Sequence, residues 1–313
     1  MKRKGNLYED IYDINNIMMV YNEVCRNTKN KRRVNTYKEY KCLYISKIHN
    51  VLKNREYTVG PYNVFTIYEP KERRIVSQNM FDKIVNHLVA RFILMPALFP
   101  SLIPENVASR KGLGTKAGIE LMNEFSRKCK IKYKKYYILK CDITKFFASI
   151  DHDVLKEKLR RKIKDKEALK IVFDIIDSEE QGLGIGNMTS QVLAVFYLND
   201  MDHFIKEKLK IKYYVRYQDD FILLHHSKEY LNYCLGEIDK YVTKEKLELN
   251  KKTRIYSNNN NFIYLGRSRF GKYAKYRSVK RRLKKAYYLY EKEIIDLKSL
   301  ISRIQCYEFM MKK

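Results

Sequence analysis

Two adjacent carboxylates, Asp219 and Asp220, stand between two apolar runs at residues 213–217 and 221–224. An apolar run, a short polar break and a second apolar run predict a β-hairpin, here with both acids at its tip. Neighbouring carboxylates repel each other, so holding two of them together is costly unless a cation neutralises them. Magnesium is a hard divalent cation that prefers carboxylate oxygen, and we therefore expect the hairpin tip to bind Mg²⁺.

A third acid, Asp142, ends another apolar run at residues 136–141. An isolated pair of aspartates is most often a solvated turn. The apolar flanks of Asp219 and Asp220, together with the matching acid upstream, favour a metal site over such a turn. Three acids at two strand ends of a strongly basic chain indicate two-metal phosphoryl transfer on a nucleic acid.

The charge of the chain points to a polyanionic partner. Its 313 residues include 64 Lys and Arg against 36 Asp and Glu, which gives a net charge of +28 spread along the whole length. Nucleic acid is the partner that such a charge favours, with binding that weakens as salt rises. A membrane surface is the alternative, but the sequence has no basic amphipathic anchor or lipidation motif, and prolines interrupt its apolar stretch at 92–103.

The six cysteines are scattered, with no Cys-x-x-Cys pair and no zinc-ligand spacing with histidine. This pattern is typical of reduced thiols in a cytosolic protein. The N-terminus is basic but lacks the apolar segment of a secretory signal. We therefore expect a cytoplasmic protein without a membrane partner.

The periodicity of the apolar residues predicts the elements that position the three acids. The fold class that follows is α+β, because strands and helices alternate from residue 136 onward and the acids fall at strand ends. The predicted helices cover 7–56, 81–99, 118–129, 151–164 (with Asp151 as N-cap), 166–177, 190–208, 228–246 and 275–311; the predicted strands cover 62–70, 136–142, the hairpin 213–226, 253–256 and 262–266, and 71–75 is a basic turn.

Four motifs, taken together and in their order, resemble those of reverse transcriptases. The Tyr217-Gln218-Asp219-Asp220 stretch resembles the Y-x-D-D box, and residues 142–152 resemble the first acidic motif of the family. Residues 185–191 sit where the family has its G-x-x-x-S box, and Tyr264-Leu265-Gly266 resembles the primer-grip hairpin. The resemblance implies a right-hand polymerase fold, with an N-terminal helical extension at 1–60, fingers at 61–135, a palm at 136–270 that includes a helical insertion at about 151–180, and a short helical thumb at 271–313.

The resemblance also implies an activity, that of an RNA-directed DNA polymerase. Such an enzyme copies a template RNA from a primer into cDNA and consumes dNTPs. Asp142 and Asp219 would ligate two Mg²⁺ ions, or Mn²⁺ in their place, with Asp220 as a looser ligand and the Ile143 carbonyl as a further one. The metals would lower the pKa of the primer 3′-hydroxyl and neutralise the leaving pyrophosphate.

Further site residues follow from the same resemblance, and each also has a plainer interpretation. The residues implied to clamp the triphosphate could equally lie in a solvated basic turn, and the aromatic residue implied to lie under the sugar could be a core side chain. The loop at 109–115 and the C-terminal helices could simply be solvated polar surface. Phe146 is expected to point into the core. The implied nucleotide-binding residues are Lys71, Arg73, Phe147, Ile185 and Gln191, and the implied nucleic-acid-binding residues are Arg110, Lys111, Leu265, Gly266 and Lys284.

The G-x-x-x-S box suggests a subgroup. Most of the family has Gln before the Gly and Pro after the Ser, whereas this chain has Ile185 and Gln191. That form resembles the reverse transcriptases of diversity-generating retroelements, which implies errors at template adenines, mutagenic retrohoming and a small basic accessory protein. Because Gln218 departs from the usual box, a short bacterial reverse transcriptase of antiviral defence, or another unclassified bacterial one, stays open as the alternative. A non-catalytic RNA-binding scaffold is a third possibility, against which the three intact acids argue.

Overall fold

The computed structural model describes residues 3–67, 73–268 and 275–311. The chain divides into two compact units. Unit 1 comprises Met1–Asn63 and Val76–Asn258, and unit 2 comprises Val64–Ile75 and Asn259–Lys313. Helices and strands are mixed in both units, so the predicted α+β class is confirmed.

A four-stranded antiparallel sheet lies at the centre of unit 1. Its strands are β3 (Tyr137–Cys141), β4 (Tyr213–Tyr217), β5 (Asp220–His225) and β6 (Arg254–Ser257), in the order β4-β5-β3-β6. The run from Phe221 to Leu224 is buried on both faces of the sheet, with each residue at most 1% exposed. An uninterrupted apolar run is what such a doubly covered strand requires.

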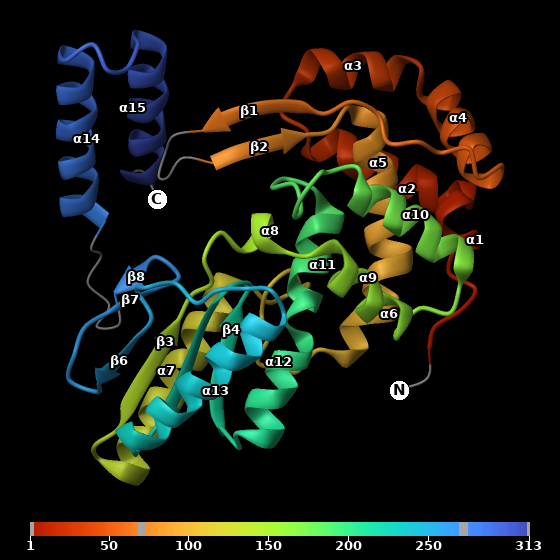
Figure 1. Cartoon of the computed structure of the whole chain (residues 1–313). Coiled ribbons are helices and arrows are strands. Elements are labelled where there is room, and N and C mark those ends of the chain that lie inside the picture. Colours follow the sequence, from red (N-terminus) through yellow and green to blue (C-terminus); the bar gives the residue numbers. More distant parts are fainter. Residues whose placement is uncertain (1–2, 68–72, 269–274, 312–313) are drawn as a thin grey trace. The chain divides into compact units, whose positions relative to one another are not determined.

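Two long helices pack on this sheet (Figure 1). Helix α7 (Thr115–Tyr133) contacts β4 and β5, and α13 (Lys228–Lys244) contacts β3, β5 and β6. The hydroxyl of Ser227 accepts a hydrogen bond from the Tyr230 amide and so caps the start of α13. Helix α7 begins three residues before the predicted start at 118.

The apolar helix predicted at 81–99 is the core helix of unit 1. It runs through α5 (Met80–Leu88), the π-helical η1 (Val89–Leu94), α6 (Met95–Leu98) and the 3₁₀ turn η2 (Phe99–Ser101). The helix widens just before Pro96, whose missing N–H cannot bond the carbonyl four residues earlier. The stretch Met80–Ser101 is long and apolar enough to cross a membrane, but most of it is buried inside the structure, where it contacts α2 and α11.

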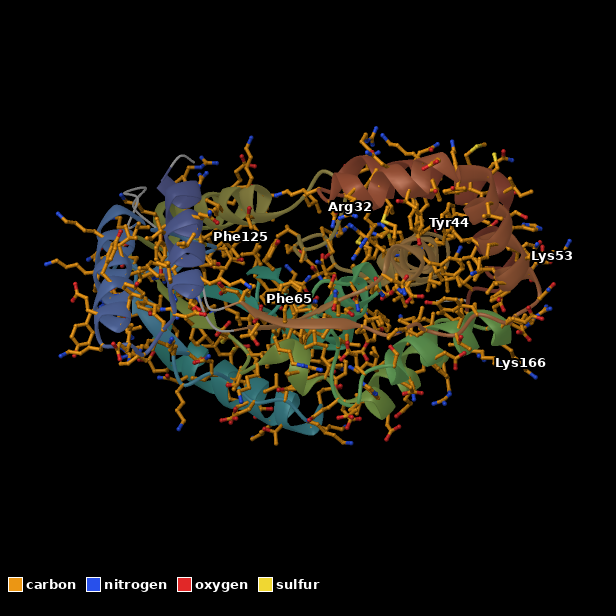
Figure 2. The ribbon with its side chains drawn as sticks, turned by 90° about the horizontal axis from the view of Figure 1, so that it is seen from above. Arg32, Tyr44, Lys53, Phe65, Phe125 and Lys166 are labelled. Carbon is orange, nitrogen blue, oxygen red and sulfur yellow. The ribbon has the colours of Figure 1, made fainter. Side chains whose placement is uncertain are left out.

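The N-terminal residues are helical, as the sequence predicted for 7–56, and they form four separate helices. These are α1 (Glu9–Tyr12), α2 (Ile14–Asn27), α3 (Lys31–Glu39) and α4 (Lys41–Lys53). Figure 2 shows basic side chains such as Arg32, Lys53 and Lys166 extending outward from unit 1. The high positive charge is therefore displayed on the surface.

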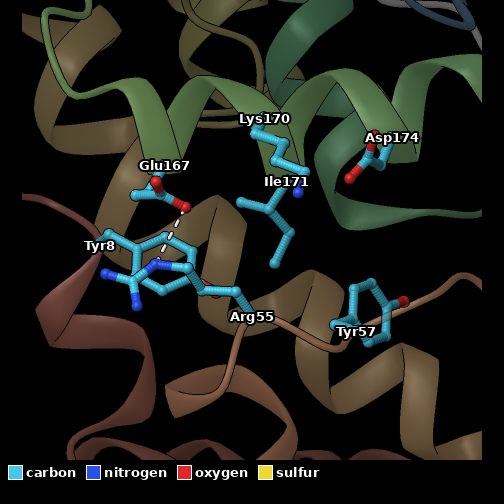
Figure 3. A pocket seen from close by; sticks show the side chains of 7 residues that line it. All are labelled: Tyr8, Arg55, Tyr57, Glu167, Lys170, Ile171 and Asp174. Atoms are coloured by element: carbon cyan, nitrogen blue, oxygen red, sulfur yellow. Dashed lines mark ion pairs between the residues drawn. The ribbon is translucent and has the colours of Figure 1, made fainter.

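The N-terminal segment is fastened to α10 (Lys166–Asp177), which follows α9 (His152–Arg160). The Asp165 carboxylate caps α10 through the Ala168 amide and also accepts the amides of Leu7 and Tyr8 at 2.8 and 3.0 Å. Beside this joint, Arg55 Nε lies 3.0 Å from a Glu167 oxygen in a small pocket (Figure 3). These contacts explain why the helical extension belongs to the same unit as the sheet.

The remaining helices of unit 1 include one that the sequence did not predict, at Phe146–Ser149, and three that divide the helix predicted at 190–208. They are α8 (Phe146–Ser149), α11 (Met188–Tyr197), α12 (Asn199–His203) and the π-helical η3 (Phe204–Lys208). The helix predicted at 190–208 thus begins two residues earlier and is interrupted at Leu198. Asp151 caps α9 through the Val154 amide, as predicted.

The hairpin and helices of unit 2 are built from segments far apart in the sequence. Strand β1 (Asn63–Ile67) pairs with β2 (Arg73–Ser77), so residues from Arg73 onward form a strand rather than the predicted turn. A second hairpin joins β7 (Ile263–Tyr264) to β8 (Arg267–Ser268). Helices α14 (Lys275–Glu291) and α15 (Leu297–Met311) pack against each other.

Candidate active site at the turn between β4 and β5

The two neighbouring acids lie at a two-residue turn. Tyr217 pairs with Asp220 across the hairpin, which leaves Gln218 and Asp219 as the turn itself. Gln218 has a φ of 55°, in the left-handed region that tight turns use. The hairpin that the sequence predicted, with both acids at its tip, is confirmed.

The third acid reaches the same place through the sheet register. Cys141, the last residue of β3, pairs with Phe221 of β5. Asp142 follows Cys141 and Asp220 precedes Phe221, so the antiparallel arrangement brings Asp142 beside Asp220. The register thus explains how acids from two separate strand ends come together.

The pKa of Asp220 is shifted by burial and by the two neighbouring acids. The pKa of its carboxyl is raised to about 6, chiefly by burial and to a smaller extent by the negative charges of Asp142 and Asp219. The ammonium of Lys140, whose Nζ lies 2.8 Å from Asp220 Oδ1, acts in the opposite direction. The carboxylates of Asp142 and Asp219 therefore disfavour the charged form of Asp220, and the Lys140 ammonium offsets part of this effect.

Asp142 is held by a residue that the sequence did not single out. The Asn250 amide nitrogen donates to the Asp142 carbonyl at 2.7 Å, and its side-chain Nδ2 donates to Asp142 Oδ2 at 3.0 Å. Next to it, buried Ile143 forms a β-bridge with Leu249. In the sequence, Asn250 is distinguished only by lying downstream of the hairpin. That position does not reveal its contact with Asp142.

The donor set of this turn suits a magnesium ion. Carboxylate oxygens and the nearby Ile143 carbonyl are hard donors of the kind that Mg²⁺ prefers. Among the described residues, no three His, Cys, Asp or Glu side chains already form a metal-binding group. In this structure Lys140 donates a hydrogen bond to Asp220, and Asn250 donates one to Asp142. The raised pKa of Asp220 shows that its charged form is disfavoured here, and a bound cation would stabilise that form. Asp142, Asp219 and Asp220 thus fit the ion, provided that these partners yield to it.

A buried arginine anchors the turn from behind. Arg216 is fully buried, and its Nη1 donates to the Gln218 carbonyl at 2.8 Å, next to Asp219. Its Nε and Nη2 bind the two carboxylate oxygens of Asp202 at 2.7 and 2.6 Å. The only sequence signal for this anchor was a charged residue inside the apolar run at 213–217.

The loop before α7 lies along β4. The amide of Arg216 donates to the Glu105 carbonyl, and the Val107 amide donates to the Arg216 carbonyl, both at 3.1 Å. Gln218 Nε2 also donates to the Ser109 hydroxyl at 3.2 Å. Residues 105–107 thus pair with β4, and the loop at 109–115 that was expected to hold template follows them beside the β4–β5 turn.

The two basic residues of this loop differ in their surroundings. Arg110 Nη1 donates to the carbonyls of Ile103 and Asn106, both at 3.0 Å, so the guanidinium closes its own loop. Lys111 is exposed. Lys111 is therefore the more accessible of the two to a phosphate.

Phe147 lies in α8, directly after the first acid motif. It is half-buried and packs edge-on against Phe146, which is buried in the core as expected. The two rings diverge because of the helical turn, and not because of the strand alternation that the sequence suggested. Gly182 packs closely against the backbone of α8. Its φ is 68°, and a Cβ at this position would lie 2.5 Å from the Phe147 carbonyl oxygen.

The G-x-x-x-S box lies at the start of α11. Ile185 is half-buried in the preceding loop, and its carbonyl accepts the Val76 amide at 3.4 Å. Gln191 is exposed on the first turn of the helix. The two departures from the usual box thus lie in different surroundings, one in a loop and one on a helix.

The other predicted residues fall in unit 2 or outside the described residues. Lys71 lies outside them, as does the side chain of Arg73. Leu265 and Gly266 form the two-residue turn of the β7–β8 hairpin, with φ values of 48° and 77°. Lys284 is exposed on α14.

The sequence as a whole matches a known family. Residues 63–268, more than half of the chain, match the family described as reverse transcriptase (RNA-dependent DNA polymerase). The chain belongs to the reverse transcriptase family. All three acids, the G-x-x-x-S box and the β7–β8 hairpin fall within the part that matches this reverse transcriptase family.

A curated relative and two solved structures extend this comparison. The chain is 23% identical over 224 residues to the putative COX1/OXI3 intron 1 protein of Saccharomyces cerevisiae, covering 66% of this chain and 26% of that protein. It resembles Candida albicans telomerase in complex with a fragment of telomeric RNA (TM-score 0.53, 14% identity, 73% of this chain and 48% of the other). It also resembles a truncated apo telomerase of Candida tropicalis (TM-score 0.51, 14% identity, 70% and 56%). The chain thus spans about a quarter of the intron protein and about half of each telomerase, and the expected polymerase fold is confirmed.

Proposed function

We propose that this protein is an RNA-directed DNA polymerase, copying a template RNA into cDNA from a primer and dNTPs. The observation that carries the proposal is the meeting of Asp142, Asp219 and Asp220 at the end of one sheet, in a family whose description names this activity. A strongly basic surface supports it, because template and primer are both polyanions.

The residues at and beside the turn would have two roles, metal binding and the positioning of the acids. Asp142, Asp219 and Asp220 would hold two divalent cations, Mg²⁺ or Mn²⁺, which when bound would supply charge neutralisation at the reacting phosphate. The Arg216 guanidinium fixes the Gln218 carbonyl and with it the direction of the adjacent Asp219. Asn250 fixes Asp142 in the same way from the other side. The protein's part is thus to position the acids before substrate arrives.

The other residues that the family motifs imply would bind the substrates. Phe147 would lie under the sugar and exclude a 2′-hydroxyl, with Ile185 and Gln191 near the nucleotide. Lys71 and Arg73 would clamp the triphosphate, because a lysine point charge and an arginine fork both suit phosphate oxygens. Template and primer would be contacted by Arg110, Lys111, Leu265, Gly266 and Lys284.

The polymerase subdomains would follow the expected divisions. The helices before residue 61 form an extension, residues 61–135 the fingers, 136–270 the palm and 271–313 the thumb. The four-stranded sheet would be the core of the palm. A cytoplasmic location remains part of this proposal, supported by six free cysteines.

Primer extension tests the activity. The purified protein should extend a DNA primer on an RNA template with Mg²⁺ and dNTPs, and chelation of the metal should stop it. The Asp219→Asn/Asp220→Asn double variant should lose extension yet still bind the primer–template. Extension by this variant at the wild-type rate would overturn the proposal, and wild-type binding without extension would favour the non-catalytic scaffold.

A finer proposal concerns fidelity. Ile185 is apolar and can pack but cannot donate a hydrogen bond to a nucleotide, whereas the Gln more common there can. One lost hydrogen bond is worth roughly 1 kcal/mol, about fivefold in discrimination, so Gln191 must contribute to any heavy error rate. We infer an error-prone enzyme of the diversity-generating type, with template adenine as the main site of error and a small basic accessory protein.

Sequencing of cDNA made on an adenine-rich RNA tests this subtype. Errors should concentrate at template adenines and should decrease in the Ile185→Gln variant. Ile185→Leu is the matched control, since it keeps an apolar side chain and should leave the error pattern unchanged. Errors spread evenly over the four bases would favour a reverse transcriptase of antiviral defence.

A further inference from the structure

Five aromatic rings form a continuous file on the surface of unit 1. They run from Tyr133 to His226, His225, Tyr230 and Tyr233, with successive centroids 4.7, 4.3, 4.7 and 5.8 Å apart. The Tyr133 and His226 rings are stacked, with an angle of 23° between their planes. None of these five residues has a part in the catalytic site described above.

The file lies at the end of the sheet opposite the three acids. Asp220 begins β5 and His225 ends it, and His225 pairs with Tyr137 at the start of β3. Five residue-to-residue steps along the strand separate the two ends, which amounts to roughly 17 Å. In Figure 1, α7 ends and α13 begins together at this lower edge of the sheet. The rings therefore form a surface distinct from the active site.

This surface is both exposed and basic. His226 is exposed and Tyr233 is 55% exposed, whereas Tyr133, His225 and Tyr230 are half-buried. Lys132 Nζ lies 4.9 Å from the centre of the Tyr133 ring. Of the nearby acids, Glu124 is paired with Lys128, and Glu229 accepts a hydrogen bond from Ser227. The exposed basic residues around the file are Arg127, Lys130, Lys132, Lys134, Lys135 and Lys228.

We propose that this aromatic–basic surface binds single-stranded nucleic acid outside the catalytic site. Unpaired bases stack on aromatic rings, and lysines contact the intervening phosphates, which is the combination that single-strand binding requires. An acidic protein could pair its carboxylates with the lysines, but carboxylates would not stack on the file of aromatic rings as unpaired bases do. The unpaired parts of the template RNA are the source that we assign, and that assignment rests on the proposed function. The surface would hold one stretch of RNA while another passes the acids.

Binding of a short oligonucleotide tests the proposal. The probe is a fluorescein-labelled, unstructured oligouridylate of about 20 nucleotides, longer than the site of a typical single-strand binding fold. The His226→Ala/Tyr233→Ala double variant should bind it roughly tenfold or more weakly, since each stacked base contributes a comparable factor. Affinity for an RNA duplex of equal length, whose bases are already stacked, should change little.

A matched control separates stacking from charge and from misfolding. Tyr40 is 50% exposed and lies between Lys38 and Lys41, but it stands outside the ring file. Tyr40→Ala should therefore leave oligouridylate binding unchanged. Wild-type affinity in the His226→Ala/Tyr233→Ala variant, or an equal loss for single strand and duplex, would overturn the proposal.

Crosslinking locates the contact and identifies the strand. A 4-thiouridine RNA should crosslink to peptides within residues 127–137 or 225–233, and crosslinks confined to other segments would refute the assignment. Unlabelled oligouridylate should compete more strongly than a thymidine oligomer of equal length, and stronger competition by the DNA would overturn the assignment to template RNA. The Asp219→Asn/Asp220→Asn variant should keep this binding, so failure of the polymerase proposal and failure of this one give different results.

Discussion

Arg216 and Asp202 form a buried ion pair directly behind the turn between β4 and β5. Two parallel hydrogen bonds of 2.7 and 2.6 Å join them, and neither side chain is exposed to solvent. Burial lowers the pKa of the Arg216 guanidinium, but the Asp202 carboxylate outweighs this and the net pKa is raised. Tyr214 and Asn106 also donate to Asp202, at 2.6 and 3.3 Å. The active-site turn is thus fixed to α12 and to the loop before α7 by one guanidinium–carboxylate contact.

Asp202→Asn should destabilise the protein strongly. It leaves the Arg216 charge buried without a counter-charge, which typically costs about 3–5 kcal/mol. Chemical denaturation measures the loss of unfolding free energy. The Asp202→Leu/Arg216→Met double variant should be less destabilised than Asp202→Asn, because it buries no unpaired charge.

The same double variant separates stability from positioning. It removes the donor to the Gln218 carbonyl, so extension should fall at least tenfold even in protein that remains folded. A fall in turnover with little change in KM for dNTP would match a misplaced turn. Wild-type turnover in the folded double variant would show that the arginine is only structural.

Magnesium binding should weaken as pH falls through about 6. The raised pKa of Asp220 means that its carboxyl keeps a proton at pH values where an ordinary aspartate is ionised, and a protonated carboxyl is a poor ligand. The charged form is disfavoured in the fold, so stability of the metal-free protein should fall as pH rises through the same range. Titration calorimetry of metal-free protein at several pH values measures the affinity.

Two variants check the origin of that pH dependence. Lys140→Met removes the ammonium that lowers the pKa of Asp220, so the loss of magnesium affinity should begin at a higher pH. Asp220→Asn should bind the ion more weakly at every pH and should show a flatter pH profile. An unaltered profile in both variants would mean that another group controls binding.

Gly182→Ala should damage the site from a distance. Its Cβ would lie 2.5–2.7 Å from backbone atoms of Phe147 and Ala148, at a φ of +68° that alanine rarely adopts. We expect a loss of about 1–3 kcal/mol in unfolding free energy and a clear fall in extension, because α8 must move. Gly236→Ala is the matched control: nothing lies near its Cβ in α13, and it should stabilise the protein by about 1 kcal/mol. Equal behaviour of the two variants would contradict the close approach.

Phe147→Ala should relax the choice of sugar. If the half-buried ring lies under the nucleotide, its removal should raise ribonucleotide incorporation while dNTP use falls less. Phe146→Ala, in the core beside it, should reduce stability by about 3–5 kcal/mol without changing the ratio of the two substrates. Competitive extension with mixed nucleotides measures that ratio. An unchanged preference in Phe147→Ala would place its ring in the core only.

The sequence alone determined the local elements and the chemistry of the acids. The hairpin at 213–225 was predictable because two apolar runs and the short polar break between them are local properties of the chain. Helix α10 and the capping role of Asp151 followed from apolar spacing and from an N-cap preference that acts over one turn. The family motifs identified Asp142, Asp219 and Asp220 without any knowledge of how strands pair.

Only the tertiary structure decided which distant residues support those acids. The order β4-β5-β3-β6, which places Asp142 beside Asp220, depends on contacts between segments far apart in the chain. The same holds for Asn250 at Asp142 and for the ring file that joins α7 to α13. Arg216 shows the reason most clearly. In the sequence it is one more basic residue among 64, and only a buried carboxylate from another element makes a charged side chain in the core favourable.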